Sequence, residues 1–143
     1  MTDTAEIIKE IRPYEGGKEY YGREAGFQIV TNKQTITLAI DDESCCCESW
    51  GYFLTEDDTD KFVGAELRAV EITDTNRSGK TFPTGYDYNE KDDAIHLEDG
   101  DVLFVDIKTD HGTLQFVAYN AHNGYYGHEA RVSSTQLTYS KGL

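Results

Sequence analysis

The stretch that decides the fold is DVLFVDIKTDHGTLQFVAYN, residues 101–120. Its two halves, 101–109 and 113–120, are rich in β-branched and aromatic side chains, which favour strands. Between them, Asp110-His111-Gly112 has the length and the glycine of a tight turn. The sequence therefore predicts an antiparallel β-hairpin here, which is the clearest structural signal in the chain.

Further segments have the same strand-like composition on either side of this hairpin. They are residues 27–31, 34–40, 50–54, 66–73 and 130–134. The first two are joined by Asn32-Lys33, which has the length of a hairpin turn. We therefore expect a twisted, mostly antiparallel sheet of about six or seven strands.

Two short helices complete the expected fold. Residues 1–13 resemble an N-capped helix that ends at a proline, and three isoleucines fall on one helical face. These isoleucines are Ile7, Ile8 and Ile11. Residues 55–63 follow a capping-box pattern, with Thr55 at the cap and a carboxylate three residues later. The predicted class is thus α+β, in a single domain over residues 1–143, with a long irregular loop at residues 74–93.

Composition excludes several classes of protein. The chain has 143 residues, and 27 acidic against 13 basic residues give a net charge of −14. No apolar run approaches the ~18 residues of a membrane-spanning helix, so we expect no membrane partner. The acidity argues against direct binding to nucleic acid through phosphates. The N-terminus lacks the pattern of a secretory signal, and the contiguous cysteines fit a reducing cytoplasm.

The sequence predicts no enzyme. It contains no GxSxG, P-loop, GxGxxG or HExxH pattern, and spacing alone cannot show that two carboxylates flank a substrate. We therefore expect no catalytic residues and no bound cofactor, with zinc as the alternative.

The negative charge is concentrated in two blocks. Residues 41–60 hold eight acids and no base, and residues 87–106 hold eight acids and one base. The rest of the chain holds 12 bases and 11 acids. Such blocks are compatible with simple solvation, with divalent-cation binding, or with an acidic face that occupies a basic groove of a partner. The candidate partner-binding residues are Asp41, Asp42, Glu43, Glu56, Asp57, Asp58, Asp60, Asp92, Asp93, Glu98 and Asp99.

A polar-aromatic segment follows the hairpin at residues 119–128. Tyrosine rings offer flat area, and Asn and His offer directional hydrogen-bonding groups, which suits a base or nucleotide. The candidate ligand-binding residues are Tyr119, Asn120, His122, Asn123, Tyr125, Tyr126, His128 and Arg131. The alternative is structural, with Asn and Gly supporting turns and the Tyr rings covering the core.

A zinc site is a third possibility. Two thiolates and two imidazoles would suffice, and the candidates are Cys45, Cys47, His122 and His128. Adjacent cysteines on a strand point to opposite faces, so Cys46 could not join its two neighbours. The chain contains no CxxC, and buried inert cysteines remain the simpler interpretation.

Three segments carry a resemblance to a known family. They read SCCCESWGYF at 44–53, EDD at 56–58 with FVGAEL at 62–67, and LQFVAYNAHNGYYGH at 114–128. Over about residues 25–135 the chain resembles a family of small uncharacterised proteins frequent in bacteriophages and prophages. The third cysteine departs from that family's two-cysteine pattern, and the family supplies no catalytic residues. The resemblance implies a small accessory phage protein in the cytoplasm of a bacterial host.

The leading functional hypothesis is therefore a non-enzymatic antagonist of a host defence or nucleic-acid-handling complex. Its acidic surface would act like a DNA mimic or an anti-CRISPR protein. The first alternative is a small-ligand binder that sequesters a cyclic nucleotide immune signal through Tyr119–His128. The second is a small structural zinc domain. The oligomeric state is left open.

Overall fold

The fold is seen in a computed structural model, which describes residues 5–16, 23–41, 48–56, 58–75, 77, 100–122 and 129–143. Within these residues the chain forms nine β-strands and one 3₁₀ turn. The elements are β1 (Ile8–Gly16), β2 (Glu24–Thr31), β3 (Thr35–Asp41), β4 (Glu48–Leu54), η1 (Thr59–Phe62), β5 (Leu67–Thr73), β6 (Gly100–Thr109), β7 (Gly112–His122), β8 (Glu129–Ser133) and β9 (Thr138–Gly142).

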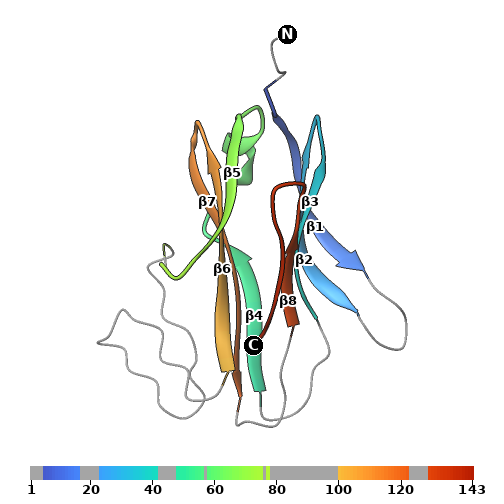
Figure 1. Ribbon diagram of the computed structural model, residues 1–143, viewed down its shortest axis with the longest axis vertical. Coiled ribbons are helices and arrows are strands. Elements are labelled where there is room, and N and C mark those ends of the chain that lie inside the picture. The colour runs from blue at the N-terminus through green and yellow to red at the C-terminus, as the bar shows by residue number, and fades with distance from the viewer. Residues whose placement is uncertain are drawn as a thin grey trace.

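The strands form two sheets that face each other as a β-sandwich (Figure 1). One sheet has the order β1-β2-β3-β8-β9 and the other has the order β4-β7-β6-β5. Neighbouring strands are antiparallel throughout. The predicted hairpin is the central pair β6–β7 of the second sheet, and Gly112 closes it with a φ of 120°.

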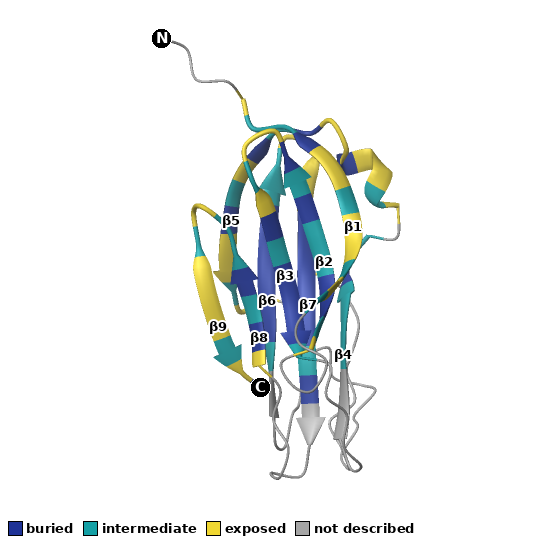
Figure 2. Ribbon diagram, turned by 90° about the vertical axis from the view of Figure 1, so that its right-hand side faces the viewer, coloured by how far each residue is buried: buried dark blue, intermediate teal, exposed yellow. Residues whose placement is uncertain are grey.

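One hydrophobic cluster lies between the two sheets. Strand alternation points one set of side chains inward, for example Ile29 and Leu38 from one sheet and Leu103 and Phe116 from the other. These four side chains are at most 1% exposed. Figure 2 shows the buried positions running along the inner strands, while β9 at one edge is largely exposed. Burial of this shared apolar face is the main force that holds the sheets together.

The predicted N-terminal helix is wrong: its residues 8–13 belong to the edge strand β1, which continues to Gly16. The register shifts between Ile8 and Glu10, so a bulge interrupts the strict alternation. Ile8 is buried and Ile11 packs against the same core, three residues apart. The bulge therefore produces the spacing that resembles a helical face, while β-branched isoleucine favours the strand.

The second predicted helix is also wrong, since residues 55–63 contain only the single 3₁₀ turn η1. Asp58 occupies the N-cap position without a side-chain capping hydrogen bond. Phe62 at the end of the turn is 3% exposed and belongs to the core cluster. Anchoring of Phe62 thus fixes this connection, and the class is all-β instead of α+β.

Each predicted strand overlaps an observed strand, although residues 34, 66 and 134 lie just outside, and β1 and β9 were not expected. Most of the predicted irregular loop at 74–93 lies outside the described residues, and the single-domain assignment stays a prediction. Among the residues that the structure describes, no helix has the length and apolarity needed to cross a membrane.

Candidate functional site

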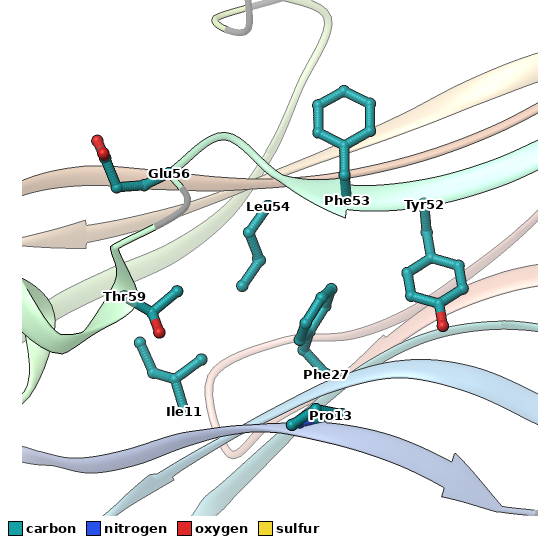
Figure 3. Close-up of a pocket in the computed structure, with 8 residues that line it drawn as sticks. All are labelled: Ile11, Pro13, Phe27, Tyr52, Phe53, Leu54, Glu56 and Thr59. Atoms are coloured by element: carbon teal, nitrogen blue, oxygen red, sulfur yellow. The ribbon is translucent and has the colours of Figure 1, made fainter.

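An apolar groove lies on one side of the sandwich, where β1 and β4 form the edges of the two sheets. Its cavity volume is about 330 Å³, at the lower end of the ~300–1,000 Å³ typical of ligand pockets. Its lining residues are Ile11, Pro13, Phe27, Tyr52, Phe53, Leu54, Glu56 and Thr59 (Figure 3). Three elements, β1, β4 and the connection to η1, thus surround a space floored by an aromatic ring from β2.

Strand alternation builds the walls of the groove. Figure 3 shows Tyr52 and Leu54 pointing from β4 toward Phe27, whereas the ring of Phe53 points to the opposite side. The rings of Phe27 and Tyr52 meet edge to face, with centroids 5.8 Å apart. Phe116 of the core lies 6.4 Å from each of them. This aromatic cluster gives the floor a defined shape, because such ring pairs have preferred geometries.

The rim of the groove is acidic at the η1 end. Glu56 and Thr59 line the cavity, and the carboxylate of Glu56 lies 2.7 Å from the ammonium of Lys61. Asp58 and Asp60 flank Thr59, and both are exposed to solvent. Within the described part of the chain, neither aspartate forms an ion pair. The groove therefore joins an apolar interior to two unneutralised carboxylates.

The first acidic block does not form one patch. Figure 1 shows that β3 ends at the opposite end of the sandwich from η1, so Asp41 lies far from Asp58 and Asp60. The seven residues of β4 alone span roughly 20 Å. Asp41 instead accepts a hydrogen bond from the backbone N–H of Glu129, at 2.7 Å.

The other predicted partner-binding acids lie outside the described residues. They are Asp42, Glu43, Asp57, Asp92, Asp93, Glu98 and Asp99. Of the expected set, the structure therefore places Asp41, Glu56, Asp58 and Asp60, and it brings together the last three.

One member of the second acidic block is structural. Asp106 is 1% exposed, and its Oδ2 lies 2.9 Å from both Nε and Nη2 of Arg77. Gln115, fully buried beside it, donates to Asp106 Oδ1 at 2.8 Å. The hydrogen bond and charge of Asp106 raise the pKa of Arg77. Asp106 thus holds the chain after β5 against the outer face of the second sheet.

Two of the predicted ligand-binding residues, Tyr119 and Asn120, point to opposite faces of the second sheet. Tyr119 is half-buried and packs against Phe104 and Val117 on the outer face. Its neighbour Asn120 is fully buried and donates from Nδ2 to the carbonyl oxygen of Leu143 at 3.2 Å, on the core side. Adjacent residues on a strand point apart, so these two side chains do not share a ligand.

Arg131, the cation of that predicted set, is already engaged. Its guanidinium forms two hydrogen bonds with Glu24, at 2.6 and 2.9 Å. These bonds raise its pKa. The remaining predicted residues, Asn123, Tyr125, Tyr126 and His128, lie outside the described residues, as does the side chain of His122.

The predicted zinc site falls largely outside the described chain. Cys45, Cys47 and His128 belong to ranges that the structure does not describe, and His122 is placed only as the backbone partner of Glu48. Among the described residues, no cluster of three or more His, Cys, Asp or Glu side chains could hold a metal.

Sequence reasoning missed the apolar groove. Its contributors come from β1, β2, β4 and the η1 connection, which are far apart in the sequence. The local signal is the run Tyr52-Phe53-Leu54, which belongs to the predicted strand 50–54. β4 is an edge strand because it pairs only with β7 in its sheet. No local sequence pattern reveals this strand order.

Comparison with known proteins gives a family but no close relative of established function. No curated protein and no solved structure matches the chain. A family model described as "Domain of unknown function (DUF7448)" matches residues 5–132. The match begins before β1, so the N-terminal strand lies within the family domain. The chain therefore belongs to the DUF7448 family.

Proposed function

We propose that this protein is a non-enzymatic phage accessory protein that antagonises a host defence or nucleic-acid-handling complex. Its acidic end, which is the η1 end of the sandwich with Asp58 and Asp60, binds a basic surface of that complex and takes the place of nucleic acid there. The observation that carries the proposal is the pair Asp58 and Asp60, two exposed carboxylates without ion pairs in the described chain, next to an open groove.

The acidic turn is rigidly held, which favours binding. Phe62 anchors it in the core, and Nδ1 of His111 lies 2.9 Å from the carbonyl oxygen of Lys61. Just after the turn, the backbone N–H of Gly64 donates to the carbonyl of Ile8 at 2.8 Å. A preorganised turn loses little conformational entropy when a partner binds.

Three cations of the described chain are neutralised by their own neighbours. Lys61 pairs with Glu56, Lys108 lies 2.7 Å from Glu71, and Arg131 pairs with Glu24. A nucleotide needs positive potential near its phosphates. The pairing of these three cations favours a basic protein partner over a nucleotide ligand.

A displacement assay tests this proposal. Purified CRISPR effectors and restriction endonucleases are bound to a labelled DNA duplex, and the protein is added at about 50 and about 300 mM salt, because exposed charges are screened at high ionic strength. We expect displacement at low salt that weakens at high salt. The double variant Asp58→Asn/Asp60→Asn should displace less DNA.

The matched control is Asp74→Asn/Glu129→Gln, which removes two exposed carboxylates elsewhere on the molecule. It should displace DNA as well as the native protein does. If both double variants lose activity equally, net charge acts without a defined site and the proposal is wrong. It is also wrong if displacement does not depend on salt.

A further inference from the structure

We infer that the groove between β1 and β4 binds an apolar side chain from an extended, basic segment of the partner protein. This inference rests on the proposed function and deepens it, because it names the chemistry of the segment that the acidic end recognises. The occupant is a peptide segment with an aliphatic or aromatic residue flanked by lysine or arginine.

The interior of the groove fits an apolar occupant. Ile11 and Leu54 contribute aliphatic walls, and the half-buried rings of Phe27 and Tyr52 form the floor. Figure 3 shows these side chains converging on the cavity from both sheets. An inserted side chain would remove apolar surface from water on both partners, which is the main source of affinity in such pockets.

The rim fits positive flanking residues. The groove opens beside Asp58 and Asp60, while Lys61, which follows Asp60 in the chain, is held by Glu56 at 2.7 Å. Lysine and arginine on either side of the inserted residue can reach these carboxylates with long side chains. The same rim disfavours an occupant that carries phosphate or carboxylate groups.

The edge of β1 favours side-chain insertion over the addition of a strand. Pro13 lies on this edge strand and has no N–H to donate, and the bulge between Ile8 and Glu10 breaks the regular ladder. Both features hinder an incoming strand from pairing along β1. The partner segment is therefore recognised through its side chains in the groove.

Binding of synthetic peptides to the full-length protein tests this inference. The probe is a fluorescent peptide GKRILIKRG, measured by anisotropy. Two matched peptides are GKRSGSKRG, without the apolar centre, and GEEILIEEG, with reversed charges. We expect each matched peptide to bind at least about tenfold more weakly than the probe, because each lacks one of the two interactions.

Variants of the protein locate the binding site. Thr59→Trp places a large ring at the mouth of the groove and should weaken binding of the probe about tenfold. Ile11→Arg adds a cation to the apolar wall on the exposed edge strand and should have the same effect. The control Thr138→Trp adds the same ring to exposed β9, and its affinity should be unchanged. Thermal melting identifies any variant that fails to fold.

The results separate this inference from the proposed function. The inference is overturned if the probe does not bind, if it binds no more tightly than GKRSGSKRG, or if folded Thr59→Trp and Ile11→Arg both bind it like the native protein. If those variants still displace DNA from a host complex while Asp58→Asn/Asp60→Asn does not, the proposed function stands without the groove. If the groove variants lose both activities, the two proposals are supported together.

Discussion

Arg131 on β8 forms two hydrogen bonds with Glu24 on β2 across the intervening strand β3. Nε lies 2.6 Å from Oε2, and Nη2 lies 2.9 Å from Oε1. The pair joins strands that have no direct backbone pairing with each other. About a third of the Arg131 side chain and a fifth of that of Glu24 remain exposed, at 32% and 19%. The bidentate geometry thus ties three strands of one sheet together and withdraws a cation from ligand binding.

Glu24→Gln should therefore lower the free energy of unfolding by about 1 kcal/mol, because it removes a bidentate, charge-assisted interaction that solvent partly screens. Urea denaturation followed by circular dichroism measures this change. The control is Glu10→Gln, which alters a more exposed carboxylate 3.5 Å from Arg12. If the two variants have the same urea midpoint, the Glu24–Arg131 pair contributes nothing specific.

Gln115→Leu should destabilise the fold by about 3 kcal/mol, since it leaves several buried polar groups without partners. The Gln115 amide donates to Asp106 Oδ1 and to the Thr75 carbonyl, and it accepts from the Arg77 N–H. Leucine fills similar space but satisfies none of them. Thr113→Leu, an exposed site two residues earlier on β7, is the matched control for chemical denaturation. Equal stability of the two variants would show that the network is not important.

The β6–β7 hairpin could be predicted because the residues that specify its strands and its turn are neighbours in the sequence. β-Branched and aromatic residues and a glycine turn lie within 20 consecutive positions, and the observed register joins Thr109 to Gly112. The strands at 27–31 and 34–40 were predictable for the same reason. The error at residues 1–13 arose because the bulge between Ile8 and Glu10 depends on pairing with β2, which the local sequence does not reveal.

The candidate site was harder to predict than the fold. Charge density identified Asp58 and Asp60, but it grouped them with Asp41, which the length of β4 separates from them. Tyr119 and Asn120 looked like one ligand-binding set, and strand alternation divides them between the outer face and the core. The groove needs residues from both sheets, so it follows from tertiary packing and from no single segment.

Gly26→Ala should destabilise the protein by about 3 kcal/mol, because the added methyl group would overlap backbone that cannot move aside. A Cβ at Gly26 would clash with the carbonyl oxygen of Leu38 and would lie 2.9 Å from Cα of Ala39 on β3. Gly142→Ala is the control, since a Cβ there meets no atom within 4 Å. Thermal and urea denaturation of both variants measure the difference. A native-like Gly26→Ala protein would contradict the close approach of β2 and β3.

Tyr119 should make stability depend on pH in the alkaline range. Burial against Phe104 and Val117 raises its pKa above the ordinary value of 10.0. Below that value the phenol is neutral in both states, and its full contribution to stability is present. Above it the unfolded chain ionises first, so the free energy of unfolding falls as pH rises, until the folded protein ionises as well.

Urea denaturation at a series of pH values should therefore show a steeper alkaline loss of stability for the native protein than for Tyr119→Phe. Tyr139→Phe, which removes an exposed hydroxyl from β9, controls for a general effect of losing a tyrosine. Parallel alkaline slopes for the native protein and Tyr119→Phe would mean that the Tyr119 hydroxyl is as well solvated in the folded protein as in the unfolded chain.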